Sequence, residues 1–265
     1  MSEVSPLFVQ SVEKAMKVLT AFDGSKRQLS LSEIAAITEL DTSAAQRFTH
    51  TLAALGYLVK DRATRKYELS VRLLDFTYHY LASNDLVHRA TPVLQKLARD
   101  TEEVCNLTVP DGTDIVFVLR IISRNVMNPN VIVGSRLPAY CTAPGLAILS
   151  TWPAEEVDDF LARSALVKHT PRTVADPRKI KARLARVRAA GYAHTRDELY
   201  PDDISTASPV LDPGGRAVGA LNIAVSRARW NEERDEERYA GLLRAAAAAV
   251  SAPQQPHKRG MRGAA

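Results

Sequence analysis

Basic side chains are concentrated in one part of the N-terminal third of the chain. Residues 43–72 carry a net charge of +4, although residues 1–85 as a whole contain ten basic and ten acidic side chains. The whole chain is also basic, with a formal net charge of +5. Lys and Arg side chains can neutralise phosphate groups, so this stretch permits nucleic acid as a partner.

The elements around these charges predict a winged helix-turn-helix. Apolar residues recur at helical spacing over 9–22, 31–38 and 42–55, and Ser30 with Glu33 forms a capping box before the second helix. Two short strands at 57–59 and 66–69 follow, joined by the charged segment 61–65. The alternative is a small helical cap whose charged hairpin is only a solvated loop.

The third predicted helix has the polar side chains that base recognition needs. Gln46 suits an adenine edge, and Arg47 suits either a guanine edge or a phosphate. His50 is expected to contact the DNA backbone, and the hairpin cations are expected to contact phosphates or the minor groove. The core side of this helix is assigned to Ala45, Phe48, Leu52 and Leu55. The predicted DNA-binding residues are Thr42, Ser43, Ala44, Gln46, Arg47, His50, Arg62, Arg65 and Lys66.

The hydrophobic pattern of the second half predicts an α+β domain with a mostly antiparallel sheet. After helices at 71–82 and 86–103, strands are expected at 106–109, 115–119, 131–133, 206–211 and 217–225. Further helices are expected at 143–152, 154–163, 177–190 and 232–250. The predicted organisation is a DNA-binding domain at 8–70, a linker helix at 71–85, a second domain at 86–250 and a disordered tail at 251–265.

Several short motifs occur in the order in which a known family has them. The first half contains FVQSVEKAMKVL at 8–19, LSEIA at 31–35 and GYL at 56–58. The second half contains GSRLP at 134–138, APG at 143–145, AGYA at 190–193 and ASPV at 207–210. On these motifs, which span residues 8–250, the chain resembles the IclR (isocitrate lyase regulator) family of bacterial transcription factors.

The resemblance implies an N-terminal winged helix, a linker helix and a C-terminal GAF-like effector-binding domain. It also implies a homodimer formed through the N-terminal domain, paired in some members into a tetramer. The partners it implies are a pseudo-palindromic double-stranded DNA operator and a small organic acid, including aromatic degradation intermediates. The sequence departs from the family at Glu39, where a turn usually has Gly, and at Tyr140, Cys141, Leu146 and Asn222 near the predicted pocket.

Two sets of residues are predicted to line the effector pocket. The turn at 141–145 leads into a helix whose first amides attract carboxylates, although Pro144 has no amide N–H to donate. Tyr140 and residues 126–133 are expected to form a wall for an aromatic ring. Gapless comparison with the family over 192–224 supplies the second set, in which Arg196 is expected at the pocket rim to pair with a carboxylate. The predicted effector-binding residues are Met127, Tyr140, Cys141, Thr142, Ala143, Pro144, Thr195, Arg196, Ser205, Asn222 and Ala224. The effector is expected to be an aromatic or hydroxy acid, with repression and activation both open.

Two other classes of function stay open at this stage. An enzyme using Cys141 as nucleophile is one, but the six histidines are scattered singly, and GxSxG, HExxH, P-loop and GxGxxG motifs are missing from the sequence. A ligand-sensing module acting on a protein partner is the other, and the hairpin charges argue against it. The basic run at 178–188 is interpreted as an amphipathic helix with a solvated face, not as a second DNA-binding element.

Composition limits the remaining possibilities. The 265 residues are 46% hydrophobic and 25% charged, which is an ordinary globular balance. Cys105 and Cys141 lie far apart, so free thiols and a cytoplasmic location are expected. No catalytic residue, metal ligand or cofactor is predicted, and no membrane partner is expected.

Overall fold

A computed structural model gives the structure of the protein and describes residues 5–125, 128 and 130–251. The chain forms two units, Met1–Ser83 and Asn84–Ala265, which are described in turn. The predictions for Met127 and for the tail beyond Ser251 lie outside the described residues. None of the described helices has an apolar stretch long enough to span a lipid bilayer.

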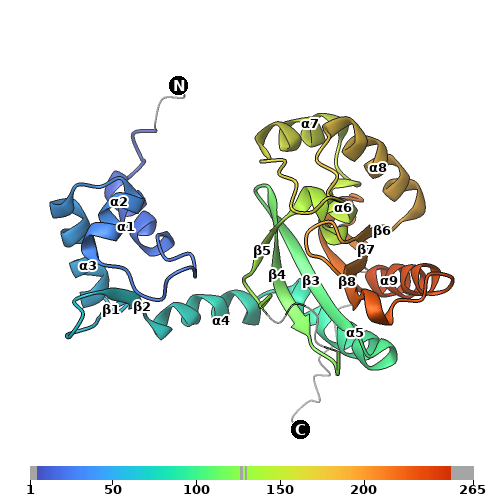
Figure 1. The fold of residues 1–265 in the computed structure, drawn as a ribbon, viewed down its shortest axis with the longest axis horizontal. Coiled ribbons are helices and arrows are strands. Elements are labelled where there is room, and N and C mark those ends of the chain that lie inside the picture. Colours follow the sequence, from blue (N-terminus) through green and yellow to red (C-terminus); the bar gives the residue numbers. More distant parts are fainter. Residues whose placement is uncertain (1–4, 126–127, 129, 252–265) are drawn as a thin grey trace, which may run out of the picture. The chain divides into compact units, whose positions relative to one another are not determined.

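The N-terminal unit has the predicted winged helix-turn-helix (Figure 1). Helices α1 (Gln10–Thr20), α2 (Leu31–Thr38) and α3 (Thr42–Ala54) precede the antiparallel strands β1 (Leu58–Lys60) and β2 (Tyr67–Leu69). The predicted capping box forms between Ser30 and Glu33, and the Asp41 carboxylate caps α3 by accepting from the Ala44 amide at 2.8 Å. The core contains Val18, Leu29, Ile34, Leu52, Leu58 and Tyr67.

Two features of this unit correct or sharpen the sequence prediction. Leu55 is expected in the core but is 53% exposed, although it keeps helical backbone geometry as the C-cap of α3. Glu39 ends α2 in the left-handed region with φ 57°, so the turn forms without glycine but at a cost in backbone strain. A short 3₁₀ helix, Val71–Leu73, leads into α4 (Leu74–Ala82), where Phe76 stacks on Tyr57 at 5.7 Å between ring centroids.

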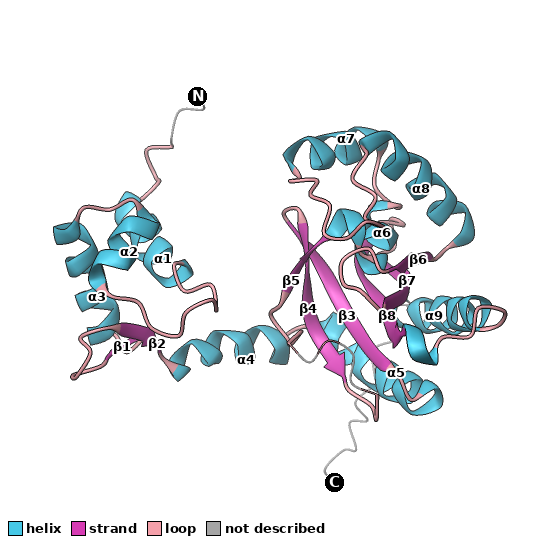
Figure 2. Ribbon diagram, in the orientation of Figure 1, coloured by secondary structure: helices cyan, strands magenta, loops and turns pink. Residues whose placement is uncertain are grey.

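The C-terminal unit is built on a six-stranded antiparallel sheet (Figure 2). Its strands are β3 (Val104–Asp111), β4 (Asp114–Ile121), β5 (Arg136–Pro138), β6 (Ala193–Arg196), β7 (Asp203–Leu211) and β8 (Ala217–Ser226). They lie in the order β5-β4-β3-β8-β7-β6, so the two halves of the domain meet at the β3–β8 pair.

Helices cover both faces of this sheet. Helices α5 (Asp85–Thr101) and α9 (Asp235–Ser251) pack together and against β3, β7 and β8. Helix α6 (Ala143–Leu149) packs against β7 and β8 on the other face, with α7 (Ala154–Arg163) and α8 (Pro177–Ala190) beyond it. In α8 the apolar residues Ile180, Leu184 and Val187 are buried, which agrees with an amphipathic helix whose basic face is solvated.

The strand predicted at 131–133 is wrong. These residues form a turn, in which the Ser135 amide donates to the Ile132 carbonyl at 3.0 Å and Gly134 adopts φ 91°. The strand follows it as β5, and the short edge strand β6 was not predicted at all. Both are only three or four residues long, which is too short for an alternating pattern to identify.

Candidate nucleic-acid interface and ligand cavity

Helix α3 presents the predicted DNA-binding side chains on its exposed face. Thr42, Ser43, Gln46, Arg47 and His50 are exposed, whereas Ala45 and Thr49 on the other face are buried. Ala44 is half-buried, and its amide is held by the Asp41 cap. The cap leaves the N-terminal turn of α3 in helical geometry on an open surface, where its side chains can reach base edges.

The wing, residues 58–69, carries its cations at an ordered tip. The Asp61 carboxylate accepts from the amides of Ala63 and Thr64 at 2.8 and 2.7 Å, and these bonds hold the pKa of Asp61 below its ordinary value. Arg62 and Arg65 are exposed and Lys66 is half-buried. Within the described residues, no acidic side chain forms an ion pair with these three cations or with Arg47. Their charge is therefore available to an external anion.

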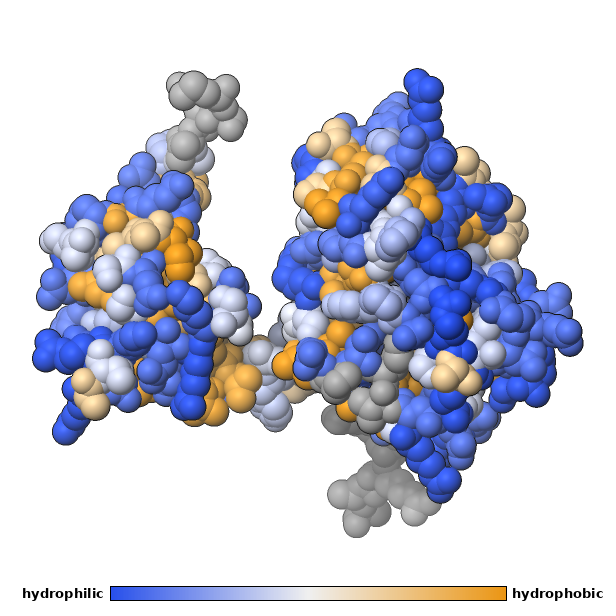
Figure 3. All heavy atoms as spheres, viewed as in Figure 1, coloured by the Kyte–Doolittle hydropathy of each residue, from blue (hydrophilic) through white to orange (hydrophobic). Residues whose placement is uncertain are grey.

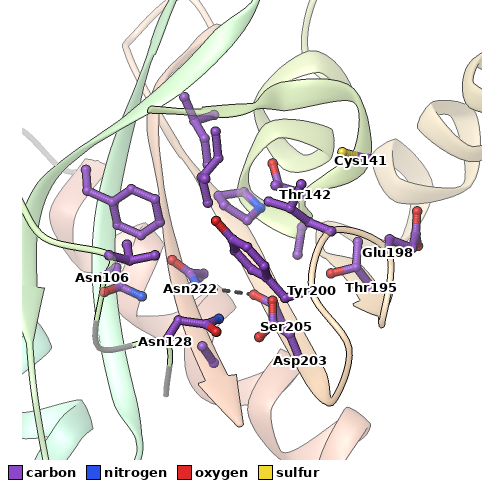
Figure 4. Close-up of a pocket in the computed structure, with 18 of the residues that line it drawn as sticks. Asn106, Asn128, Cys141, Thr142, Thr195, Glu198, Tyr200, Asp203, Ser205 and Asn222 are labelled. Atoms are coloured by element: carbon purple, nitrogen blue, oxygen red, sulfur yellow. Dashed lines mark hydrogen bonds between the residues drawn. The ribbon is translucent and has the colours of Figure 1, made fainter. Parts of the chain in front are cut away.

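A cavity lies in the C-terminal unit between the sheet and the segment that leads into α6 (Figure 4). The cavity volume is about 40 Å³, which is below the roughly 300–1,000 Å³ of typical small-molecule sites, so a bound ligand requires the lining side chains to move apart. Gly145 allows this segment to approach closely, since a Cβ there would lie 2.1 Å from the Ala139 carbonyl oxygen. The walls are apolar or aromatic at Ile115, Phe117, Val131, Leu137, Leu199 and Tyr200.

Polar side chains cross the sheet along the floor of this cavity. Asn106 of β3 lies opposite Arg120 of β4 on one side and Asn222 of β8 on the other. Ser205 of β7 lies opposite Thr195 of β6 and accepts from Asn222 Nδ2 at 3.1 Å. Arg120 donates to Asn106 Oδ1 at 3.1 Å. One face of five strands therefore supplies a continuous polar row.

The structure brings most of the predicted effector-binding residues together. The ones that line the cavity are Cys141, Thr142, Ala143, Pro144, Thr195, Ser205, Asn222 and Ala224. They come from the segment before α6, from α6 and from three strands. Met127 lies outside the described residues.

Two of the predicted positions, Tyr140 and Arg196, do not line the cavity. Arg196 follows Thr195 in β6, and because successive strand residues point to opposite faces, its side chain lies on the α9 side of the sheet. There it donates to His194 Nε2 at 2.8 Å and pairs with Glu232. Tyr140 is buried, and its hydroxyl donates to the Val167 carbonyl at 2.5 Å, away from the cavity.

Sequence reasoning missed several polar residues that line the cavity. They are Asn106, Arg120, Asn128, Glu198, Tyr200 and Asp203. The sequence signal that could have found two of them is the alternation of side chains between the two faces of a strand. Along β4 and β7 it places Arg120 and Asp203 on the same face of the sheet as the predicted Ser205. Arg120 is the only Lys or Arg among the described lining residues.

Ion pairs and hydrogen bonds fix the loop 197–202, part of which roofs the cavity. Arg183 pairs with Glu198 at 2.7 Å, and the hydroxyls of Thr170 and Thr173 each donate at 2.5 Å to a loop carbonyl, that of Asp197 or Glu198. Burial raises the pKa of Glu198, and the charge of Arg183 opposes this effect. The loop is thus held at several points that do not involve the cavity floor.

Burial shapes the charges inside the cavity. It raises the pKa of Asp203 to about 6, opposed by the charge of Arg120, and it lowers the pKa of Arg120, opposed by Asp203. Burial also raises the pKa of the Cys141 thiol to about 12. Since the thiolate is the nucleophilic form, this environment does not activate Cys141. Within the described residues, no three His, Cys, Asp or Glu side chains form a group that could hold a metal ion.

Comparison with known proteins decides the family. The model of the bacterial transcriptional regulator IclR C-terminal domain matches residues 78–252, and the IclR helix-turn-helix model matches residues 11–62. The chain belongs to the IclR family. Its two units are therefore the helix-turn-helix domain and the effector-binding domain of an IclR-type transcriptional regulator.

Three relatives illustrate the breadth of the similarity. The Pca regulon regulatory protein of Pseudomonas putida is 32% identical over 242 residues, which cover 91% of this chain and 82% of that protein. An IclR transcriptional regulator from Alicyclobacillus acidocaldarius superposes with a TM-score of 0.81 at 25% identity, covering 92% of this chain and 98% of that one. An IclR homologue from Microbacterium hydrocarbonoxydans, crystallised with 4-hydroxybenzoate, has a TM-score of 0.77 at 22% identity and covers 91% and 97% of the two chains.

Proposed function

We propose that this IclR-family protein binds a pseudo-palindromic operator through α3 and the wing, and that a small organic acid in the cavity changes its operator affinity. The observation that carries the proposal is the cavity itself. It combines apolar walls, a polar floor and one arginine within the domain type that binds effectors in this family. A ligand can shift an equilibrium only by its different affinities for two states, so the acid must favour either the DNA-competent or the incompetent form.

The acid is best matched by an aromatic carboxylate. Arg120 is the one Lys or Arg among the described residues that line the cavity, and a guanidinium can bind a carboxylate through charge-assisted hydrogen bonds. Phe117 and Leu137 offer apolar surface for a ring. The relative crystallised with 4-hydroxybenzoate supports the same class of ligand. Arg120 thus has the carboxylate-binding role that the sequence analysis predicts for Arg196.

The N-terminal unit also has a surface suited to self-association. Val12 and Met16 of α1 are 59% and 54% exposed, and Leu74 and Phe76 of α4 are 61% and 59% exposed. In the space-filling view hydrophobic side chains show at two places on this unit, over α1 and at the start of α4 (Figure 3). Exposed apolar side chains of this kind are typical of an interface, which supports a homodimer formed through this unit. A two-fold dimer would read two half-sites on the operator.

The test is an electrophoretic mobility shift with the DNA upstream of the chain's own gene, at fixed salt, with and without a panel of aromatic and aliphatic acids. We expect specific binding that one class of acid changes by about 5–150-fold, the usual range of allosteric coupling. Binding of DNA without any response to acids would reject the effector assignment. A response to acids without DNA binding would instead favour a module that acts on a protein partner.

A further inference from the structure

Two buried acceptors in the cavity lack a donor in the described part of the chain. Asp203 Oδ1 and Asn222 Oδ1 are both inaccessible to solvent, and neither receives a hydrogen bond from a described residue. Asn222 is 3% exposed and uses its Nδ2 for Ser205. Figure 4 shows Asp203, Ser205 and Asn222 close together on the sheet side of the cavity. Unpaired buried acceptors are costly, so each requires an explanation.

Asp203 differs from the other carboxylates of its loop. Asp197, Glu198 and Asp202 each pair with an arginine, namely Arg227, Arg183 and Arg227 again. The backbone of Asp203 closes the loop, with its amide donating to the Tyr200 carbonyl and its carbonyl accepting from the Asp197 amide at 2.7 Å. The Asp203 side chain takes no part in these bonds. Stabilisation of the loop therefore does not explain why a carboxylate stands at this position.

The position of Asp203 relative to Arg120 matches a ligand with two polar ends. The two residues lie on β7 and β4, which are three strand spacings apart, or roughly 14 Å across the sheet at the usual spacing. They are also offset along the strands, since Asp203 pairs with Ser226 of β8 whereas Arg120 is level with Asn222. Both side chains line the same cavity, and apolar walls lie around the space they share. A single aromatic ring with a polar group at each end would satisfy both.

We infer that Asp203, supported by Asn222, accepts a hydrogen bond from a hydroxyl group of the effector and so determines specificity for hydroxylated aromatic acids. The inference rests on the proposed function and names the ligand more narrowly. A carboxylate has no proton to donate and would be repelled by Asp203, so the acid group must bind elsewhere, at Arg120. A hydroxyl donates to either acceptor. An unsubstituted ring would leave both acceptors buried and unpaired, which is the basis of strong discrimination in polar sites.

The test is calorimetry on the full chain at pH 7.5 with benzoate, 4-hydroxybenzoate and 3,4-dihydroxybenzoate. We expect the better of the two hydroxylated acids to bind wild-type protein at least about tenfold more tightly than benzoate. In Asp203→Leu that ratio should fall several-fold, because of the two acceptors only Asn222 Oδ1 remains to be left unpaired. Asp203→Asn keeps an acceptor oxygen and should retain most of the preference. Asp202→Asn, the same change at the neighbouring exposed position, should leave the ratio unchanged.

The outcomes separate this inference from the proposed function. Equal binding of the three acids to wild-type protein overturns the role of Asp203 and leaves an aromatic acid effector standing. A tenfold ratio that survives in folded Asp203→Leu overturns it as well. If Asp203→Leu does not fold, the affinity ratios of wild-type protein and of Asp203→Asn test the inference instead. A ratio near one in wild-type protein is sufficient to reject it. Binding of none of the three acids overturns both proposals.

Discussion

The two candidate sites use arginine in opposite ways. On the N-terminal unit Arg47 and Arg62 are exposed and have no acidic partner among the described residues, whereas in the C-terminal unit Arg183 is 17% exposed and pairs with Glu198. The first arrangement leaves charge available for a polyanion, and the second uses charge to fix the walls of a cavity. The DNA surface is thus a property of one short stretch of sequence. The cavity depends on side chains from distant segments that only the folded sheet brings together.

The largest effect should come from filling the cavity. Ser205 is 5% exposed and lies on the cavity floor, so Ser205→Trp places an indole where the ligand must bind. We expect acid binding to weaken by more than about 100-fold, while operator binding without acid stays within a few-fold of wild type, because the DNA surface lies in the other unit. Calorimetry and mobility shifts measure the two quantities on one preparation.

The matched control is Val218→Trp, which adds the same ring to an exposed position of β8 outside the cavity. It should change neither quantity. If every acid that binds wild-type protein binds Ser205→Trp equally well, the effector site lies elsewhere in the domain.

The next effect concerns base recognition by α3. We expect Arg47→Ala to lower operator affinity by about 1–3 kcal/mol and to relax base preference, provided that the guanidinium contacts a base edge in bidentate fashion. Arg27→Ala is the control, since Arg27 is also exposed but pairs with Glu68 and lies outside α3. Competition binding with specific and random duplexes measures both variants. Equal weakening on both duplexes would show that Arg47 holds only phosphate.

The wing should contribute charge without sequence preference. Changing Arg62 and Arg65 together to Ala should reduce the slope of log K against log salt by about one to two units per protomer. The comparison requires affinities at four or more salt concentrations, with specific and random DNA. A slope equal to that of wild-type protein would place the wing away from the duplex.

The N-terminal unit was predictable because its signals are local. The capping box at Ser30 and the strand–turn–strand pattern are each contained within a few residues, and the structure has both. Leu55 keeps helical geometry as the C-cap of α3 but lies on the exposed side of the helix. An apolar residue on that side cannot be told from a core residue by its spacing alone.

The cavity was predictable only in part, since no local pattern shows which strands become neighbours. The family resemblance supplied Ser205 and Asn222, but it did not supply Asp203 or Arg120, which line the same cavity. Thr195 and Arg196 are consecutive in β6 and therefore face opposite sides of the sheet, so only one of them can line the cavity. A four-residue edge strand is too short to be identified from the sequence pattern, so this constraint comes only from the structure.

The smallest effect tests whether the two units share one kind of local strain. Glu39 after α2 and Glu102 after α5 both adopt the left-handed conformation, with φ 57° and 58°, which costs a residue with a Cβ more than it costs glycine. We expect Glu39→Gly and Glu102→Gly each to raise the free energy of unfolding of its own unit by about 0.5–1 kcal/mol, since the greater backbone freedom of unfolded glycine offsets only part of the relief. The two tryptophans, Trp152 and Trp230, both lie in the C-terminal unit, so urea unfolding followed by tryptophan fluorescence should report Glu102→Gly alone. Far-ultraviolet circular dichroism should report both variants. If Glu39→Gly instead lowers the free energy of unfolding, interactions of the Glu39 side chain stabilise the turn between α2 and α3 by more than the strain of its backbone destabilises it.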